Sequence, residues 1–91
     1  MSYLFKGTPF FRRALRKLLP PQKKAARRAF IIFKTNPFDP RLEAHKIHHL
    51  SKKYKRTIYA VKIEADLRAV FYIERNLVVS LDIGTHDIYK R

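Results

Sequence analysis

The chain has 91 residues, enough for a single domain with a modest core. Its 21 Lys and Arg outnumber its 7 Asp and Glu, which gives a net charge of +14 and a self-repulsion that opposes folding. A protein that keeps such a charge usually binds a polyanion: a nucleic acid, a ribosome, an anionic membrane or an acidic protein. Because the chain has no cysteine, disulfides, thiolate zinc sites and cysteine nucleophiles are excluded.

The sequence gives no sign of a targeting segment or a membrane span. Residues 1–8 lack the basic region and apolar run of a signal peptide. The longest uninterrupted apolar run, Ala29 to Phe33, is far too short to cross a bilayer. We therefore expect a cytoplasmic protein that does not interact with membranes.

The N-terminal half predicts a short strand followed by an antiparallel helical hairpin. Tyr3–Phe5 is β-prone, and Thr8 can cap a helix that begins at Pro9. Pro20 ends this helix and permits a second one, which stops before Pro37. The apolar stripes predicted to be buried are Phe11, Ala14, Leu15, Leu18 and Leu19 in the first helix and Ala25, Ala26, Ala29, Phe30 and Phe33 in the second.

The C-terminal half has the period-two pattern of β-strands. Strands are predicted at Arg56–Ile63, Leu67–Ile73 and Leu77–Ile83, joined by three-residue loops as an antiparallel meander. Residues 37–56 are turn-rich and basic, and residues 84–91 leave the sheet. The fold class is therefore α+β, with the order β-α-α-β-β-β in a single domain of residues 1–91. The helical hairpin is expected to cover one face of the sheet.

Side-chain alternation determines the predicted register, because a slip of one residue moves every side chain to the other face. Three-residue loops place Ile63 opposite Leu67, and Ile73 opposite Leu77. The side chains predicted to face the helices are Tyr59, Val61, Ile63, Leu67, Ala69, Phe71, Ile73, Leu77, Val79, Leu81 and Ile83.

On the other face of the predicted sheet, Lys62 lies opposite Arg68, and Arg68 lies opposite Asp82. Two directly opposed cations destabilise an antiparallel pair, and Asp82 offsets only part of that repulsion. The functional interpretation is a phosphate clamp, in which Arg68 binds two oxygens, Lys62 acts as a point charge and Asp82 orients Arg68. The simpler alternative is a cross-strand salt bridge with a bystander lysine.

His86 follows the last predicted strand and emerges near the edge of the Lys62–Arg68 face. Histidine transfers protons near neutral pH, and neighbouring cations favour its neutral form, which suits a base. The carboxylate of Asp87 would instead favour the protonated form of His86. Because a lone histidine in a loop is more often ordinary than catalytic, only its position supports a catalytic role.

Three more histidines, His45, His48 and His49, raise the question of a metal site. No carboxylate or thiolate is spaced to complete a familiar ligand set, so RNA contact or local packing is the preferred interpretation. The chain also lacks a Gly-rich phosphate loop and an acidic cluster for two catalytic metals. We therefore expect neither a metal nor another cofactor.

The two predicted helices carry cations opposite their apolar stripes and contain no acid. A solvated helix face is the ordinary explanation for such residues. The lack of acids favours contact with a polyanion instead, because basic stripes are the electrostatic signature of nucleic-acid binding. The cations are Arg12, Arg13, Arg16, Lys17, Lys23, Lys24, Arg27, Arg28 and Lys34.

The order of elements and three stretches of sequence resemble the RelE/ParE superfamily of toxins from bacterial toxin–antitoxin systems. The stretches are "NPFDPRLEAHKI", "YAVKIEADLRAVFYI" and "LDIGTHDIYKR". The resemblance spans nearly the whole chain and implies the compact fold of these toxins. It further implies mRNA cleavage in the ribosomal decoding site for the RelE branch, and inhibition of DNA gyrase without nuclease activity for the ParE branch.

This resemblance also implies roles for individual residues. Lys62 and Arg68 stand where RelE-like toxins have a catalytic strand lysine and a strand arginine. His86 stands where they have an arginine or, in the YafQ-like branch, a histidine. Tyr89 stands where a C-terminal aromatic often stacks on a base.

The segment His45-Lys46-Ile47 resembles the common "HKL" stretch of these toxins, which normally ends in glycine; here His49 takes that place. We expect His45, Lys46 and Asp82 to contact the substrate. A second strand lysine that is common in the RelE branch is Ala60 in this chain. That departure bears on the cleavage rate or on the choice of branch.

The implied function is that of a type II toxin, a ribosome-dependent mRNA endoribonuclease that inhibits translation. A ribose 2′-OH would attack the adjacent phosphate without a metal, while Lys62 and Arg68 stabilise the transition state, His86 moves a proton and Tyr89 holds a base. The implied partners are a cognate acidic antitoxin, the ribosome and mRNA. Two alternatives stay open: a ParE-like toxin that acts on gyrase, and a basic ribosomal or RNA-binding protein.

Overall fold

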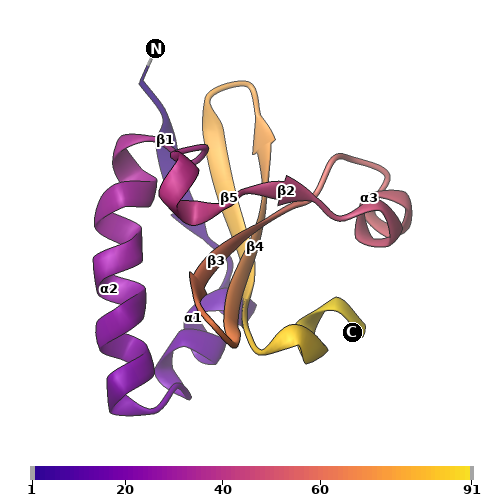
Figure 1. Ribbon diagram of the computed structural model, residues 1–91. Coiled ribbons are helices and arrows are strands. Elements are labelled where there is room, and N and C mark those ends of the chain that lie inside the picture. The colour runs from indigo at the N-terminus through magenta and orange to yellow at the C-terminus, as the bar shows by residue number, and fades with distance from the viewer. Residues whose placement is uncertain (1, 91) are drawn as a thin grey trace.

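The computed structural model describes residues 2–90 as a five-stranded sheet with helices on both faces (Figure 1). Met1 and Arg91, the two ends of the predicted domain 1–91, lie outside the described residues. The strand order is β1-β5-β4-β3-β2; β1 is parallel to β5, and the other neighbours are antiparallel. The α+β class is confirmed, and the sheet is mixed rather than a simple antiparallel meander.

The N-terminal strand leads directly into the first helix. β1 (Leu4–Gly7) pairs with the strand β5, and α1 (Pro9–Arg16) follows it. Thr8 caps α1 as predicted, because its side-chain oxygen accepts a hydrogen bond from the Phe11 N–H at 3.1 Å. α2 (Pro20–Thr35) then runs along one face of the sheet (Figure 1).

Both helices bury an apolar stripe against this face of the sheet. Phe33 of α2 packs edge-on against Phe71 of the sheet, with ring centroids 5.0 Å apart. Such pairs contribute roughly 0.5–1.5 kcal/mol beyond the burial of their area. The prediction for Leu19 is wrong: α1 ends at Arg16, so Leu19 precedes α2 instead of belonging to a stripe, and it is 65% exposed.

The segment predicted as turns contains regular structure. It forms a 3-10 turn η1 (Pro40–Leu42), an edge strand β2 (His45–Lys46) and a helix α3 (His48–Tyr54). Leu50 is the buried residue of α3, so the sequence of this helix carries no apolar periodicity that could have predicted it.

The central strands are β3 (Tyr59–Glu64), β4 (Leu67–Glu74) and β5 (Leu77–Gly84), close to their predicted ranges. β3 begins at Tyr59 rather than at Arg56 as predicted. The chain ends in a short 3-10 helix, η2 (His86–Lys90), which packs on the face of the sheet opposite α1 and α2.

The predicted register between β3 and β4 is confirmed over most of its length. Lys62 pairs with Arg68, as expected. Near the turn Ile63 is bulged and Glu64 pairs with Leu67, so residues 65 and 66 alone form the connection. The bulge adds one residue to β3 and the turn is one residue shorter than predicted, so the two differences cancel. Lys62 and Arg68 therefore remain directly opposite each other, as predicted.

The predicted register between β4 and β5 is wrong. Arg68 pairs with Gly84, and Asp82 pairs with Val70 instead of Arg68. The connection between the strands is shorter than predicted, and a bulge places Leu81 as an extra residue on β5. An extra residue in one strand shifts every pair beyond it.

The bulge also changes which side chains of β5 face the helices. Val78 and Ile83 lie in the core beneath α1 and α2, whereas Leu81 packs in the smaller core on the opposite face. Leu77 and Val79 were also predicted to face the helices. They lie on the opposite face instead, because their strand partners, Glu74 and Tyr72, lie on that face.

The sheet thus has a core on each face. The core opposite α1 and α2 lies under α3 and η2 and is formed by Ile47, Leu50, Ile58, Ala60, Val70 and Ile88. This smaller core anchors the two elements that border the candidate site. Within residues 2–90, no helix combines the length and hydrophobicity that a bilayer span requires.

Candidate functional site

A row of charged side chains crosses the sheet on the face away from α1 and α2. Lys62 and Arg68 are cross-strand partners, and alternation along the strands puts both on the face of Ala60 and Val70, under α3. The predicted pairing and face of these two cations are therefore confirmed, while their catalytic role stays a prediction. We call this pair the cation row.

Glu43 lies beside the cation row and was not predicted from the sequence. Its Oε2 is 3.4 Å from Lys62 Nζ in a solvent-exposed ion pair. The pairing of His45 with Ala60 brings Glu43 next to Lys62 across the sheet edge. Glu43 adopts a left-handed backbone, with φ 49°, which is uncommon for a residue other than glycine. The only feature of the sequence that could have drawn attention to Glu43 is that it is an acidic residue in a basic segment.

Arg68 is held in place by the turn between β3 and β4. Its Nη1 donates to the carbonyl oxygens of Glu64, Ala65 and Leu67 at 2.6, 3.1 and 3.2 Å. A guanidinium has five N–H donors, and the turn carbonyls engage only those of Nη1. The carbonyl groups orient the guanidinium while it keeps its full charge.

Asp82 does not flank Arg68, contrary to prediction. It lies opposite Val70, is 7% exposed, and accepts a hydrogen bond at Oδ1 from the Ile83 N–H at 2.8 Å. Gly84 takes the position beside Arg68. The orienting role predicted for Asp82 is thus performed by backbone carbonyl groups, and the bulge at Leu81 is the physical reason.

His86 meets Arg68 at the same turn. His86 Nδ1 is 3.3 Å from Oδ1 of Asp66, which belongs to the turn that holds Arg68. Because a carboxylate only accepts, Nδ1 of the neutral ring carries the proton and Nε2 is available to take another. Asp66 is therefore the carboxylate that acts on His86, whereas Asp87 pairs with Lys90 at 3.8 Å.

Tyr89 lies between these groups and the smaller core. Its ring meets the His86 ring edge-on, with centroids 5.8 Å apart. Its hydroxyl is buried and has no hydrogen-bond partner among residues 2–90. Burial raises the pKa of the phenol, and the nearby Arg68 guanidinium offsets part of that increase through its positive charge and its approach to the hydroxyl, although the two groups do not form a hydrogen bond of standard geometry. The structure therefore brings Tyr89, Arg68 and His86 together; stacking of Tyr89 on a base stays a prediction.

His45 and Lys46 point to opposite faces of β2. His45 is opposite Ala60, on the face of the cation row, and its Nδ1 is 3.1 Å from the Glu43 carbonyl oxygen. Lys46 is opposite Tyr59, on the side of α1 and α2. The structure therefore brings His45 to the site and separates Lys46 from it.

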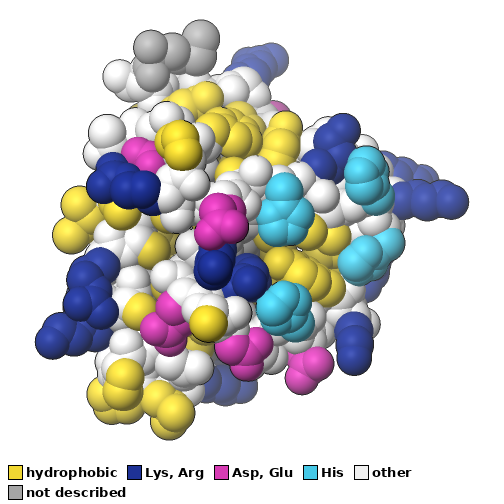
Figure 2. Space-filling model, in the orientation of Figure 1, with side chains coloured by type: hydrophobic (Ala, Val, Ile, Leu, Met, Phe, Trp, Pro, Cys, Tyr) yellow, Lys and Arg dark blue, Asp and Glu magenta, His cyan; other side chains and the backbone are white. Residues whose placement is uncertain are grey.

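The four histidines gather on one face of the molecule in Figure 2. His49 has a positioning role that the sequence did not reveal: its Nε2 is 2.6 Å from the Tyr89 carbonyl oxygen, which ties α3 to η2. In the part of the chain that the structure describes, no three or more His, Asp or Glu side chains are grouped as metal ligands.

Comparison with known proteins gives matches among solved structures. No family model and no curated protein matches the chain. An archaeal RelE–RelB complex from Pyrococcus horikoshii matches with a TM-score of 0.70 at 14% identity, over 93% of this chain and 96% of that chain. The toxin–antitoxin complex RelBE2 from Mycobacterium tuberculosis matches with a TM-score of 0.65 at 21% identity, over 94% and 100% of the chains.

YafQ from E. coli gives a similar result. The TM-score is 0.63 at 12% identity, and the match covers 96% of this chain and 97% of that chain. At such low identities the likeness concerns the fold. In every one of the three comparisons it extends over more than nine-tenths of both chains. The chain therefore has the RelE-like toxin fold.

Proposed function

We propose that the protein is the toxin of a type II toxin–antitoxin system and an mRNA endoribonuclease that inhibits translation. The observation that carries the proposal is the convergence of Arg68 and His86 on the β3–β4 turn, beside Lys62. Two cations and a histidine on one accessible face suit a reaction in which negative charge builds up on a phosphate and a proton moves.

The proposed reaction is an intramolecular transesterification of RNA. The ribose 2′-oxygen bonds to the adjacent phosphorus, and the bond from phosphorus to the 5′-oxygen of the next nucleotide breaks. One proton leaves the 2′-OH, and one is delivered to the departing oxygen. The products carry a 2′,3′-cyclic phosphate and a 5′-hydroxyl, so atoms and charge balance without a redox step.

Each residue at the cation row has a role in this reaction. Lys62 and Arg68 would stabilise the charge that accumulates on the phosphate oxygens. Neutral His86, with its Nδ1 proton donated to Asp66, would take the 2′-OH proton at Nε2. Tyr89 would hold a base through the accessible part of its ring, and His45 would contact the RNA at the β2 edge.

The proposed partners are an acidic antitoxin, the ribosome and mRNA. Two of the matching structures are a RelE–RelB complex and a toxin–antitoxin complex, which supports an antitoxin partner. The net charge of +14 suits both an acidic protein and RNA. Such a toxin would act in the cytoplasm, where mRNA is translated.

A ParE-like toxin that acts on gyrase is the second candidate, and one observation favours it. The strand lysine common in the RelE branch is replaced by Ala60, which is 0% exposed in the core under α3. The site therefore has one cation fewer than the RelE pattern requires. A ParE-like toxin would need neither the cation row nor His86.

A cleavage assay on ribosomes programmed with mRNA tests the proposal. Arg68→Ala is compared with wild type and with the control Arg56→Ala. Arg56 does not belong to the cation row, and its Nη1 lies 3.1 Å from Oε2 of Glu74. We expect Arg68→Ala to lower the rate on the order of 100-fold, while Arg56→Ala stays close to wild type. A folded Arg68→Ala that cleaves normally contradicts the proposal. A wild type that inhibits gyrase without cutting RNA makes the ParE-like candidate correct.

A further inference from the structure

A pocket of about 370 Å³ lies between the first turn of α1, the helix α3 and the strand β5. Buried residues of the smaller core form its floor, so it is on the face of the sheet that carries α3 and η2. Its volume is within the range of small-molecule sites, about 300–1,000 Å³. We call it the Asp82 pocket and define it by Phe10, Tyr54, Ile58, Leu81, Asp82 and Ile88.

The bulge in β5 gives the Asp82 pocket its charged group. Leu81 and Asp82 are consecutive, yet both line the pocket, whereas successive side chains of a regular strand point to opposite faces. A bulge interrupts that alternation, and bulges are common beside functional sites because they re-aim side chains. An apolar and a charged side chain therefore lie next to each other in one hollow.

The carboxylate of Asp82 is buried at this pocket. The residue is 7% exposed, and its Oδ1 accepts a hydrogen bond from the Ile83 N–H at 2.8 Å. A buried charge costs free energy that hydrogen-bond donors offset. Because a carboxylate has about four acceptor positions, contacts within the protein and contacts to a ligand can share it. A ligand that brings two N–H donors into an apolar pocket fits this chemistry.

Two aromatic side chains border the mouth of the Asp82 pocket. Phe10 of α1 is 47% exposed and Tyr54 of α3 is 49% exposed, whereas the floor is buried. Flat rings such as nucleobases stack on exposed aromatic side chains. Lys53 Nζ lies 5.8 Å from the centroid of the Tyr54 ring, so a phosphate attached to a bound base would be near a cation.

Guanine is the nucleobase that suits Asp82. Its Watson–Crick edge presents two adjacent N–H donors, at N1 and N2, and a carboxylate can accept both at once. Adenine, cytosine and uracil each place an acceptor beside the donor on this edge, and the carboxylate would repel that acceptor. An organic cation would also pair with Asp82, but the net charge of +14 opposes its approach.

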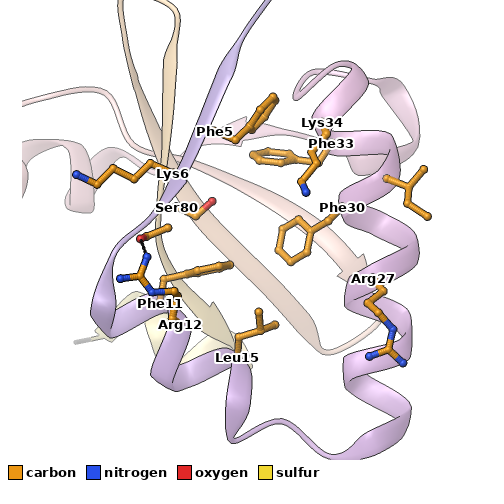
Figure 3. Close-up of a pocket in the computed structure, with 12 residues that line it drawn as sticks. Phe5, Lys6, Phe11, Arg12, Leu15, Arg27, Phe30, Phe33, Lys34 and Ser80 are labelled. Atoms are coloured by element: carbon orange, nitrogen blue, oxygen red, sulfur yellow. Dashed lines mark hydrogen bonds between the residues drawn. The ribbon is translucent and has the colours of Figure 1, made fainter.

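A larger hollow, shown in Figure 3, has a different chemistry. It has a volume of about 560 Å³ and lies between β1, α1 and α2. Among the described residues, its lining includes cations and no acid; Arg12 Nη1, for example, donates to the Gly7 carbonyl oxygen at 2.7 Å. It has no carboxylate for the N–H donors of guanine, so the assignment concerns the Asp82 pocket alone.

We propose that the Asp82 pocket binds a guanine base, with the carboxylate accepting from N1–H and N2–H and the aromatic side chains at the mouth stacking on the ring. The helix η2 joins this pocket to the cation row, because Ile88 lines the pocket and the adjacent Tyr89 contacts His86. The base belongs either to the RNA strand that crosses the cation row or to a free guanine nucleotide. Only the first source rests on the proposed function.

Short labelled RNA oligonucleotides that differ at one base test the pocket by fluorescence anisotropy. The sequence is uridine except at one position, which holds guanine or hypoxanthine, a base that lacks only the N2 amino group of guanine. Charge and length are equal, so the phosphate contacts cancel. We expect the guanine oligonucleotide to bind about tenfold more tightly, a difference of about 1.4 kcal/mol. Equal binding of the two by the wild type would overturn the proposal.

The variant Asp82→Asn locates the recognition. It keeps a side-chain oxygen for the Ile83 N–H but replaces an acceptor by a donor, so the two oligonucleotides should bind within about twofold of each other. An all-uridine RNA should bind as tightly as to the wild type, which shows that the variant is folded. A guanine preference that survives in Asp82→Asn would overturn the proposal.

A second pair of variants tests the mouth and decides the matter if Asp82→Asn does not fold. Phe10→Leu should weaken the guanine oligonucleotide at least about fivefold, because stacking is lost. Phe38→Leu is the matched control: Phe38 is 40% exposed and lies outside the pocket, so binding should stay close to wild type. Equal losses in the two variants would contradict binding at the Asp82 pocket.

Competition with free nucleotides separates the two sources of the base. Guanosine monophosphate should displace the guanine oligonucleotide at concentrations at which inosine monophosphate does not. Tighter binding of guanosine monophosphate than of the oligonucleotide would identify a free nucleotide as the ligand, and weaker binding would identify the RNA strand. Equal displacement by the two monophosphates would overturn the recognition of guanine.

These measurements concern binding, so their outcome is distinct from that of the cleavage assay. A wild type that prefers guanine but cleaves no RNA overturns the proposed function and supports the assignment of the pocket. A wild type that cleaves RNA but binds the guanine and hypoxanthine oligonucleotides equally overturns the assignment of the pocket and leaves the proposed function in place.

Discussion

At the scale of single residues, the site depends on the turn between β3 and β4. The turn carbonyls orient Arg68, and the Asp66 carboxylate of the same turn binds His86. Alternation along the strands was sufficient to predict that Lys62 and Arg68 share a face. Asp66 was missed because its contact with His86 joins two turns that are distant in sequence, and no periodicity reports such a contact.

Asp66→Asn tests this view of the site. The amide can turn either its oxygen or its NH₂ group toward Nδ1, so it no longer selects the Nε2-accepting form of His86, and we expect cleavage to fall by about tenfold. The ion pair is exposed, with side-chain exposures of 58% and 74%, so the stability should change by less than about 1 kcal/mol. Asp87→Asn is the control, because Asp87 pairs with Lys90 instead. Equal effects of the two substitutions on cleavage would contradict the role of Asp66.

Tyr89→Phe separates the ring of Tyr89 from its hydroxyl. Because the hydroxyl is buried without a partner among residues 2–90, its removal should leave the free energy of unfolding unchanged or raise it by about 1 kcal/mol. The pKa of this phenol lies above its usual value of 10.0, so it stays protonated in the folded protein where the unfolded chain begins to ionise.

The pH dependence of this variant follows from that shift. A raised pKa contributes stability below pH 10, and the contribution is lost as the pH rises through the folded-state value. We therefore expect thermal melts of Tyr89→Phe to be less sensitive to alkaline pH than those of wild type. A variant that loses stability at pH 7 would show that the hydroxyl has a partner.

At the scale of secondary-structure elements, periodicity explains what could and could not be predicted. α1 and α2 have apolar stripes and proline boundaries, and both were found from the sequence. α3 buries Leu50 and carries exposed cations, so it has no stripe to detect. The bulge at Leu81 also has no sequence signature, because Ser80, Leu81, Asp82 and Ile83 keep the polar–apolar alternation of a regular strand and no glycine or proline marks the site.

The two N-terminal helices contain charges that oppose their own stability. Lys23 and Arg27, and likewise Lys24 and Arg28, are like charges four residues apart on α2, and such pairs cost roughly 0.2–0.5 kcal/mol each. No acid in either helix offsets them. This uncompensated charge is the sequence feature that predicted a polyanionic partner.

η2 is held at the site by α3, and His49→Ala should loosen it. The substitution removes the contact between Nε2 and the Tyr89 carbonyl oxygen, which is 2.6 Å long. We expect faster amide hydrogen exchange in residues 86–90 and a lower cleavage rate, because His86 and Tyr89 are both in η2. His48→Ala is the neighbouring control. Identical exchange in wild type and both variants would contradict the positioning role of His49.

At the scale of the whole molecule, composition predicted a polyanion-binding protein but not how its surface is divided. The cation row lies on the face of the sheet that carries α3 and η2, and the basic helices α1 and α2 lie on the other face. Only the pairing of the strands reveals this division, since Lys62 and Lys34 are indistinguishable by composition. The fold thus places two groups of cations on opposite faces of one small domain.

RNA binding should depend steeply on salt. Each phosphate contact with single-stranded RNA contributes a slope of about −0.7 in a plot of log affinity against log salt concentration. Lys62→Ala and Arg68→Ala should each reduce the slope by about that amount, whereas Arg56→Ala should leave it close to wild type. Affinity measured by anisotropy across a salt series checks this. A flat dependence for the wild type would contradict phosphate binding altogether.

The chemistry of RNA ends in cells tests the central claim most directly. Wild type and Arg68→Ala are expressed under tight control, and 5′-hydroxyl ends are mapped across translated mRNA. We expect the wild type to stop growth and to create new 5′-hydroxyl ends within coding regions, paired with 2′,3′-cyclic phosphates. Arg68→Ala, expressed to the same level, should create almost none. Growth arrest by the wild type without new ends, or equal ends with the two proteins, would contradict RNA cleavage at the cation row.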